Sequence, residues 1–381
     1  MRTENGNRRR WEAGQSRAEL NTSRIAEQAK VLASHSWEHG TAAEALLELY
    51  DPHLSVFGDE PFPADKVPYT PLEETESLSY AKPHILLDAG TLIRDEHATG
   101  DPAALGVSAV LIGQSDPEYV KAAWRQAKHL LDSAPRWQNG AISHRKAVAE
   151  LWADFGYMVP PFLAYYAIVS NEMRYMREAI DQCMLYHEVL STGSLGKERG
   201  LWHHIVGPEK KDLGYWSTSN GWAAAGMARV LATMKKWKPT AAWKEEQQML
   251  VCYIQEIIDG AMRTDDGSGD GLLRNYLGDE SWFGEVSGTA LLASVVYRVA
   301  VLEPEPYGDG SWDGYLAWAH SKRAAVERHV DAATGIAAPA VQPLDHLLRE
   351  PLMTGSPEGQ SFVVLLYAAY RDWSRNGGGN S

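Results

Sequence analysis

The stretch that decides the fold reads Gly221-Trp222-Ala223-Ala224-Ala225-Gly226-Met227-Ala228-Arg229-Val230-Leu231-Ala232-Thr233-Met234. Its apolar side chains recur with the period of an amphipathic α-helix. The same period marks nine further stretches, which lie at residues 25–32, 42–49, 119–131, 148–169, 173–190, 241–262, 288–301, 312–330 and 358–373. Runs of alternating β-branched residues are almost absent, and none is long enough for a central strand. The chain is therefore predicted to be all-α.

Turn-rich segments separate these helices and hold many of the charged and aromatic residues; they lie at 51–83, 134–143, 193–215, 264–280 and 331–353. No shift in composition marks a domain boundary. A loop with Gly, His and Trp instead precedes a helix several times, as expected of helical hairpins that stack and close into a barrel. We predict one barrel domain over residues 18–375, between a flexible segment at 1–17 and a flexible tail at 376–381.

The charge balance excludes several classes of partner. The 381 residues include 36 basic and 50 acidic side chains, a net charge of −14, which disfavours nonspecific binding to nucleic acid or to an anionic membrane. No segment has 18 uninterrupted apolar residues, so no membrane span is predicted. The polar N-terminus does not resemble a signal peptide, which predicts a cytoplasmic protein, with secretion open if the N-terminus is incomplete.

The two cysteines, Cys183 and Cys252, cannot build a disulfide framework or a four-cysteine zinc site, although one bridge between them stays open. The 13 histidines show no metal-ligand spacing, so neither a metal nor a cofactor is predicted. Phosphate-binding glycine motifs and the serine-hydrolase elbow are also missing from the sequence.

The aromatic composition is unusual, with 14 Trp and 17 Tyr against 6 Phe. Rings with a flat face and a polar edge suit stacking on sugars. Large helical proteins also place Trp where helices cross, and composition alone leaves both interpretations open.

Asp154 stands alone in the apolar, aromatic stretch 152–163, with no Lys or Arg after it until Arg174. Burial there should raise the pKa of its carboxyl group and keep a proton on it, as a general acid requires. The alternative is a structural helix N-cap.

Asp101 is a second candidate for a catalytic carboxylate, although Asp followed by Pro is typical of a helix start. Asp88 is a third.

Several motifs follow one another in an order and spacing that resembles a known family. They are Gly140-Ala141-Ile142-Ser143-His144-Arg145, Leu151-Trp152-Ala153-Asp154-Phe155-Gly156-Tyr157-Met158, Gly200-Leu201-Trp202-His203-His204, Trp216-Ser217-Thr218-Ser219-Asn220-Gly221-Trp222 and Ser287-Gly288-Thr289-Ala290. The chain resembles the unsaturated glucuronyl and rhamnogalacturonyl hydrolases of glycoside hydrolase families 88 and 105, in the six-hairpin glycosidase superfamily. It is more similar to family 105, and to its fungal-type members. The resemblance runs from about residue 37 to residue 373.

The resemblance implies an (α/α)6 barrel whose active site lies on the face formed by the inter-helix loops. It also implies that Asp154 is the general acid/base and that Asp101, with Gly106 five residues later, is its carboxylate partner. The positions expected to contact an oligosaccharide substrate are His144, His204, Trp152, Trp216, Thr218 and Trp222. No obligate protein partner is expected.

The family substrate is a 4,5-unsaturated uronic acid at the non-reducing end of a lyase-generated oligosaccharide. Its double bond is conjugated to the ring oxygen as an enol ether, so a proton added at C4 leaves an oxocarbenium-like centre at C5. Water adds there, and the hemiketal opens and releases the aglycone. This route needs one protonated acid and a positioned water, unlike the displacement by two carboxylates in ordinary glycosidases.

One position departs from the pattern, because Thr218 stands where bacterial members carry an Arg that helps hold the uronate carboxylate. A hydroxyl supplies no charge. Either another cation replaces it, with Arg136, Arg145 and Arg274 as candidates in nearby loops, or the sugar differs. The alternatives left open are a hydrolase of saturated sugars or an epimerase on the same barrel, and a carbohydrate-binding pseudoenzyme.

Overall fold

Helices make up nearly all of the regular structure in the computed structural model, which describes residues 21–94, 97–193, 195–267, 269–304 and 311–378. The α-helices are α1 (Thr22–Leu32), α2 (Ser36–Tyr50), α3 (Glu76–Ala81), α4 (Gly106–Ile112), α5 (Pro117–Asp132), α6 (Phe155–Met158), α7 (Pro160–Ser170), α8 (Met173–Leu190), α9 (Ser217–Lys236), α10 (Lys244–Thr264), α11 (Val286–Leu302), α12 (Trp312–Arg328) and α13 (Pro357–Trp373).

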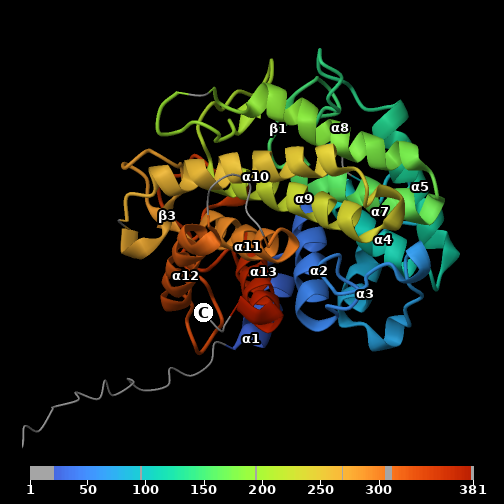
Figure 1. Ribbon diagram of the computed structural model, residues 1–381, viewed down its shortest axis with the longest axis horizontal. Helices are drawn as coiled ribbons and strands as arrows, with labels where there is room; N and C mark the ends of the chain where they lie inside the picture. The colour runs from blue at the N-terminus through green and yellow to red at the C-terminus, as the bar shows by residue number, and fades with distance from the viewer. Residues whose placement is uncertain (1–20, 95–96, 194, 268, 305–310, 379–381) are drawn as a thin grey trace, which may run out of the picture.

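Six of these helices form a closed inner ring. In order around the ring, α2 contacts α4, α4 contacts α7, and the contacts continue through α9, α11 and α13 back to α2. Figure 1 follows the chain through this arrangement, from blue α2 to red α13. The inner helices are buried along most of their length; α9, for example, is buried from Ser217 to Met234. A helix with apolar or small residues on all sides is expected to be buried in this way.

The other helices pack outside the ring. Helices α1, α3, α5, α8, α10 and α12 alternate with the inner helices along the chain, and each packs on a neighbouring inner helix. Their buried residues lie on one side; in α5 they include Tyr119, Ala122, Ala123 and Leu130. The six outer-inner pairs make an (α/α)6 barrel, so the predicted all-α fold is confirmed.

Glycine allows the inner helices to approach closely. A Cβ atom at Gly226 of α9 would lie 1.9 Å from the carbonyl oxygen of Gly156 in α6. A Cβ atom at Gly288 of α11 would lie 2.3 Å from Oγ of Ser217 in α9. Because no side chain fits in these gaps, glycine is required at both crossings.

The charged residue inside α9 is neutralised within the ring. Arg229 pairs with Glu44 of α2 at 2.7 Å, and both side chains are almost completely buried. Arg298 of α11 similarly pairs with Glu48 and with Asp372. Burying a charge is tolerated only when it is paired, so these contacts also fix how α2 sits against α9 and α11.

The sequence prediction was wrong for part of 148–169. Residues Leu151–Trp152 form a short strand, β1, that pairs antiparallel with β2 (Ile205–Val206); β3 (Leu273–Arg274) pairs likewise with β4 (Gly284–Glu285). Helices α3 and α4 were not predicted, because they are short and follow segments rich in turn residues. These two-residue strands lie in loops at the end of the barrel. They are too short to show a hydrophobic periodicity, so the sequence pattern does not predict them.

Several other expectations can be compared with the described residues. The segment 1–17 and residues 379–381 of the predicted tail lie outside them. Cys183 and Cys252 are both free thiols, so no bridge joins them. None of the described helices combines the length and the apolar character that crossing a bilayer requires.

Candidate active site

Two short stretches of backbone bring Asp154 and His204 together at one end of the barrel. In the β1–β2 ladder, Trp152 lies opposite Ile205. The N–H group of Ala153 then donates to the carbonyl oxygen of His204, with N and O 3.0 Å apart. This pairing stops the chain from becoming helical before residue 155 and places the Asp154 side chain beside the imidazole of His204.

A second set of backbone bonds places Asp101 beside His144. The N–H of Thr99 donates to the carbonyl oxygen of His144 at 2.7 Å, and the N–H of His144 donates to the carbonyl oxygen of Glu150 at 2.8 Å. Oγ of Ser143 accepts from the N–H of Glu150 at 3.0 Å. The motif around His144 is therefore a compact loop held by its own hydrogen bonds.

Both carboxylate–histidine pairs face one cavity of about 470 Å³. Its lining residues are His35, Trp37, His97, Ala98, Asp101, His144, Arg145, Trp152, Asp154, Met158, His204, Ile205, Lys210, Lys211, Asp212, Trp216, Pro343, Leu344, His346, Leu347 and Glu358. The structure thus brings together six of the eight residues that the sequence analysis named. A cavity of this size is typical of small-molecule sites.

Asp154 occupies the N-cap position of α6, but its side chain makes no capping hydrogen bond. Its Oδ2 atom is buried and accepts no hydrogen bond among the described residues. Nε2 of His204 lies 3.5 Å from that atom. The structural N-cap interpretation therefore does not explain Asp154, and its carboxylate is directed to the cavity instead.

The expected rise in the pKa of Asp154 is not what the structure shows. Burial acts to raise this pKa, but the contact with His204 and the charge of His144 outweigh burial, so the pKa lies below its usual 3.8. The sequence contains no Lys or Arg near Asp154, and the histidines that replace them come from other loops. Because the pKa of His204 is raised above 6.5, the pair is a carboxylate beside an imidazolium between pH 3.8 and pH 6.5.

Asp212 completes this group from the far side of the imidazole. Its Oδ2 lies 2.9 Å from Nδ1 of His204 and also accepts a hydrogen bond from the hydroxyl of Tyr276. Burial would lower the pKa of His204, but Asp154 and Asp212 together raise it above 6.5. Hydrogen bonds from His204 and Tyr276 in turn outweigh burial and lower the pKa of Asp212.

The indole of Trp152 separates the two carboxylate–histidine pairs. Nε2 of His144 lies 3.4 Å from Oδ1 of Asp101. The His144 ring stacks on Trp152 with centroids 5.0 Å apart, and the His204 ring meets Trp152 edge-on at 5.8 Å. Each carboxylate therefore faces a histidine of its own, so the charge of Asp154 is set by His204 rather than by Asp101 alone.

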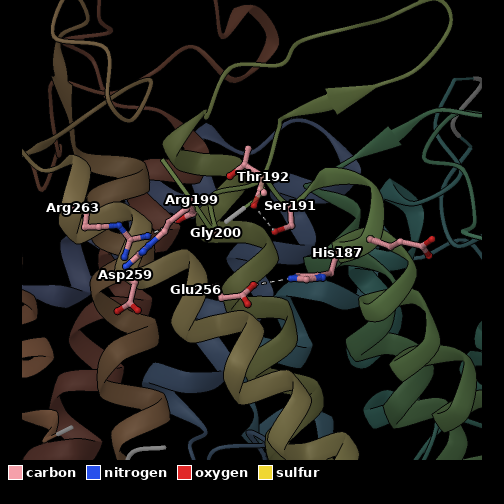
Figure 2. Close-up of a pocket in the computed structure, with 10 residues that line it drawn as sticks. His187, Ser191, Thr192, Arg199, Gly200, Glu256, Asp259 and Arg263 are labelled. Atoms are coloured by element: carbon pink, nitrogen blue, oxygen red, sulfur yellow. Dashed lines mark hydrogen bonds and ion pairs between the residues drawn. The ribbon is translucent and has the colours of Figure 1, made fainter. Parts of the chain in front are cut away.

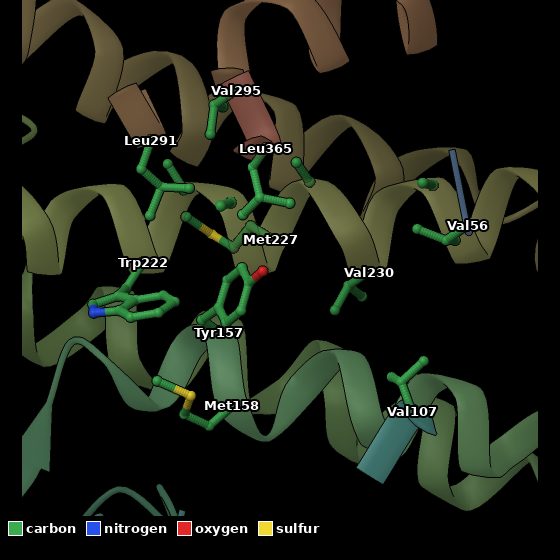
Figure 3. Close-up of a cluster of buried hydrophobic side chains, with 14 of the residues drawn as sticks. Val56, Val107, Tyr157, Met158, Trp222, Met227, Val230, Leu291, Val295 and Leu365 are labelled. Atoms are coloured by element: carbon green, nitrogen blue, oxygen red, sulfur yellow. The ribbon is translucent and has the colours of Figure 1, made fainter. Parts of the chain in front are cut away.

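The two tryptophans that flank the start of α9 have different surroundings. Trp216 lines the cavity, packs on His204 with centroids 4.6 Å apart and donates from Nε1 to Oδ1 of Asn275 at 2.8 Å. Trp222 is fully buried and packs on Tyr157 with centroids 4.5 Å apart. Figure 3 shows Trp222 inside the apolar cluster between the inner helices, so its expected stacking on sugar is wrong.

Thr218 also lies away from the cavity. It is fully buried in the first turn of α9 and is not among the lining residues, so the expected contact with substrate is wrong. The cations that do line the cavity are Arg145, Lys210 and Lys211. Arg136 instead pairs with Glu178 at 2.9 Å.

Buried Glu150 holds the backbone of the loop that carries Lys210 and Lys211. Its Oε1 accepts from the backbone N–H groups of Glu209 and Lys210 at 2.9 and 2.6 Å, and its Oε2 accepts from Nε1 of Trp152 at 3.1 Å. No ion pair joins Lys210 or Lys211 to an acidic side chain among the described residues. The loop therefore presents free positive charge to the cavity.

Several lining residues were not predicted from the sequence; they include Trp37, Lys210, Asp212, His346 and Glu358. Lys210 and Asp212 lie in the turn-rich segment between two of the quoted motifs and belong to neither of them. Trp37 and Glu358 are the second residues of α2 and α13, which lie near opposite ends of the sequence. Only the closing of the ring brings them together, so no local signal could have found them.

His204, Asp212 and His346 place one nitrogen or oxygen each within 4.8 Å of one another. Such atoms can bind a metal, but here His204 and Asp212 already bind each other. Burial and the positive charge of His204 lower the pKa of His346 to about 4, so its imidazole is neutral at neutral pH. Oδ2 of Asp212 also lies 3.5 Å from Nε2 of His346, so the three side chains form one contact network beside Asp154.

A second cavity of about 510 Å³ lies between α8 and α10. Figure 2 shows Glu256 of α10 pointing toward His187 of α8, and these side chains form an ion pair at 2.7 Å. Arg263 donates to the carbonyl oxygens of Lys197 and Arg199. None of the eight predicted catalytic and substrate-binding residues lies there, and its charged groups are largely paired with protein.

Comparison with known proteins identifies the family. The profile of Glycosyl Hydrolase Family 88 matches residues 88–301, which contain both carboxylate–histidine pairs. The chain belongs to glycosyl hydrolase family 88. The family 88 chain is also 24% identical over 217 residues to the unsaturated rhamnogalacturonyl hydrolase YesR of Bacillus subtilis. That match spans 53% of the chain and 60% of the relative's own length.

Solved structures show the same fold. A possible member of family GH105 from Salmonella enterica serovar Paratyphi A superposes with a TM-score of 0.72 at 18% identity, covering 97% of each chain. The unsaturated glucuronyl hydrolase of Bacillus sp. GL1 superposes with a TM-score of 0.63 at 14% identity, covering 91% of the family 88 chain and 94% of the other. The assignment to fungal-type members stays a prediction.

Proposed function

We propose that this protein removes a 4,5-unsaturated uronic acid from the non-reducing end of lyase-generated oligosaccharides. The observation that carries the proposal is the Asp154–His204 pair. One oxygen of a buried carboxylate is left without a hydrogen bond at a cavity, and the imidazole of His204, whose pKa is raised above 6.5, lies 3.5 Å away. Proton transfer to a substrate carbon needs such an acid, held ready and shielded from water.

The proposed reaction adds one water molecule to the substrate. The His204–Asp154 pair supplies a proton through Oδ2 of Asp154, and the π electrons of the C4–C5 bond form the new C4–H bond. The positive charge at C5 is shared with the ring oxygen. A water oxygen then bonds to C5 and returns its proton to Asp154, which leaves a hemiketal. The hemiketal opens, C5 becomes a ketone, and the hemiacetal at C1 releases the aglycone as an alcohol.

Asp101 and His144 are proposed to position the sugar. Their side chains face the same cavity as Asp154, across the indole of Trp152. A carboxylate can accept hydrogen bonds from neighbouring sugar hydroxyls, and a negative charge there also favours the cationic centre that develops at C5. Asp101 would therefore both help to bind the sugar and stabilise the cationic transition state.

Thr218 cannot supply the positive charge that an Arg at this position gives to the uronate carboxylate. We propose that Arg145, Lys210 and Lys211 supply this charge instead. All three line the cavity. The guanidinium of Arg145 already lies over the Trp152 ring, 5.6 Å from its centroid. The lysines are the better candidates for the uronate carboxylate, because neither of them pairs with an acidic side chain or packs on a ring among the described residues.

The test is a screen with fragments made by pectin, ulvan and glycosaminoglycan lyases. Hydration destroys the conjugated enol ether, so its ultraviolet absorbance should fall in one of these sets and should not fall without the protein. In heavy water the product should gain one deuterium at C4 at early times. Release of sugar from saturated oligosaccharides, with no deuterium gained at carbon, would contradict the proposal and favour an ordinary hydrolase.

A further inference from the structure

Glu358 is a buried carboxyl group in the cavity wall that the proposed reaction does not use. It is the second residue of α13, its side chain is only 3% exposed, and it lines the cavity with Asp154. Its Oε1 atom accepts a hydrogen bond from Nε1 of Trp37 at 2.8 Å. Trp37 lines the same cavity and stacks on His35 with centroids 4.7 Å apart.

The other oxygen of Glu358 has no protein partner. Oε2 is buried and makes no hydrogen bond among the described residues, and no Lys, Arg or His there forms an ion pair with Glu358. The start of α13 does not supply a donor either, because the N–H of Gly359 is taken by Oγ of Ser356 at 3.0 Å. A buried, ionised carboxylate would not be left with an empty oxygen and no cation.

The charged groups that act most strongly on the pKa of Glu358 are acidic. They are Glu38 of α2, Asp154 at the start of α6 and Glu285 before α11. Burial, more than these charges, raises the pKa of Glu358 well above 4.5. The hydrogen bond from Trp37 acts in the opposite direction but does not offset burial.

We propose that Glu358 is a neutral carboxylic acid that donates a hydrogen bond from Oε2 to an oxygen of the terminal sugar, while its Oε1 holds the indole of Trp37. The nature of the sugar rests on the proposed function. The other acidic side chains of the cavity can only accept hydrogen bonds when ionised. Glu358 therefore supplies a hydrogen-bond donor to an anionic sugar in a cavity whose wall also contains carboxylates.

Two substitutions separate this role from its alternatives. Glu358→Gln keeps the size, the absence of charge, an acceptor for Trp37 and a donor toward the cavity, so kcat/KM should stay near the wild-type value. Glu358→Leu removes the donor, and kcat/KM should fall about tenfold, as expected for the loss of one hydrogen bond.

The same variants on the methyl ester of the substrate show which oxygen accepts. A smaller defect of Glu358→Leu on the ester points to the uronate carboxylate, and an unchanged defect points to a hydroxyl or ring oxygen; either result supports the donor. Equal loss in Glu358→Gln and Glu358→Leu would overturn the proposal, since it would mean that Glu358 transfers a proton or works as an anion. Wild-type activity in Glu358→Leu would overturn it as well.

Infrared difference spectra of wild type against Glu358→Gln give a readout without substrate. A carboxylic-acid C=O band at neutral pH that disappears in the variant is expected, and a carboxylate band in its place would overturn the proposal. Absence of turnover by the wild-type protein on every unsaturated fragment would instead contradict the proposed function. The two failures are therefore distinguishable.

Discussion

Nε2 of His204 lies 3.5 Å from Oδ2 of Asp154, and the opposite nitrogen of the same ring is bound by Asp212. The imidazole is thus held between two carboxylates in a buried position. This arrangement keeps one proton next to Asp154 although the carboxyl group itself has a lowered pKa. The acid of the proposed reaction is therefore the pair rather than an isolated aspartic acid, which changes what mutations around it should do.

Replacing Asp212 with Asn should shift the pH profile of the enzyme. Asp212 is one of two carboxylates that outweigh burial and raise the pKa of His204 above 6.5, so its loss lowers that pKa. The proton is then lost at lower pH, and the alkaline limb of kcat should move down by about 1–3 units. The measurement is kcat against pH.

The matched control is Asp259→Asn, which changes a carboxylate at the second cavity. It should leave the alkaline limb where it is. An Asp212→Asn profile that overlays the wild-type profile would show that His204 does not hold the reactive proton.

Removing the free lysines should weaken substrate binding with little effect on the chemical step. Lys210→Ala and Lys211→Ala should each raise KM about tenfold, the equivalent of one hydrogen bond to a charged group. KM should also depend less on salt in the variants, because screening acts on the charge that has been removed. Lys128→Ala, on the exposed face of α5, is the control. Unchanged KM in both variants would leave Arg145 as the carboxylate ligand.

Trp222→Ala should affect stability rather than binding. The side chain is fully buried among the inner helices, so its removal should cost about 3–5 kcal/mol of the free energy of unfolding. The folded fraction should keep the wild-type KM, whereas Trp216→Ala should change KM because Trp216 lines the cavity. Urea unfolding and steady-state kinetics check the two effects. A raised KM with unchanged stability for Trp222→Ala would restore the stacking role.

Gly226→Ala tests how closely the inner helices pack. The added methyl group would meet the carbonyl oxygen of Gly156, and overpacking of this kind costs about 1–3 kcal/mol or more. Gly314→Ala is the matched control, because no atom lies within 4 Å of a Cβ at this helical position. That change should stabilise the protein by about 0.5–1 kcal/mol. Equal melting temperatures for the two variants would contradict the packing of α9 on α6.

The sequence predicted the fold better than the site. Helix α9 has a periodic pattern over residues 221–234, which is a local signal, and the family resemblance that the loop motifs carry implied a closed barrel. The charge state of Asp154 could not be predicted in the same way, because His204 reaches it through the β1–β2 pairing. Trp222 and Thr218 lie close in sequence to a cavity residue, Trp216, but on helical backbone that turns their side chains into the protein.

The initial rate at which the enol-ether absorbance is lost, measured for wild type and Asp154→Asn at saturating substrate, tests the central claim most directly. The Asn side chain keeps the shape of Asp154 but cannot pass a proton to C4. We expect kcat to fall by about 10²–10⁴-fold, the usual contribution of general acid–base catalysis, with KM nearly unchanged. A kcat for Asp154→Asn close to that of the wild type would contradict the assignment of Asp154 as the group that delivers the proton.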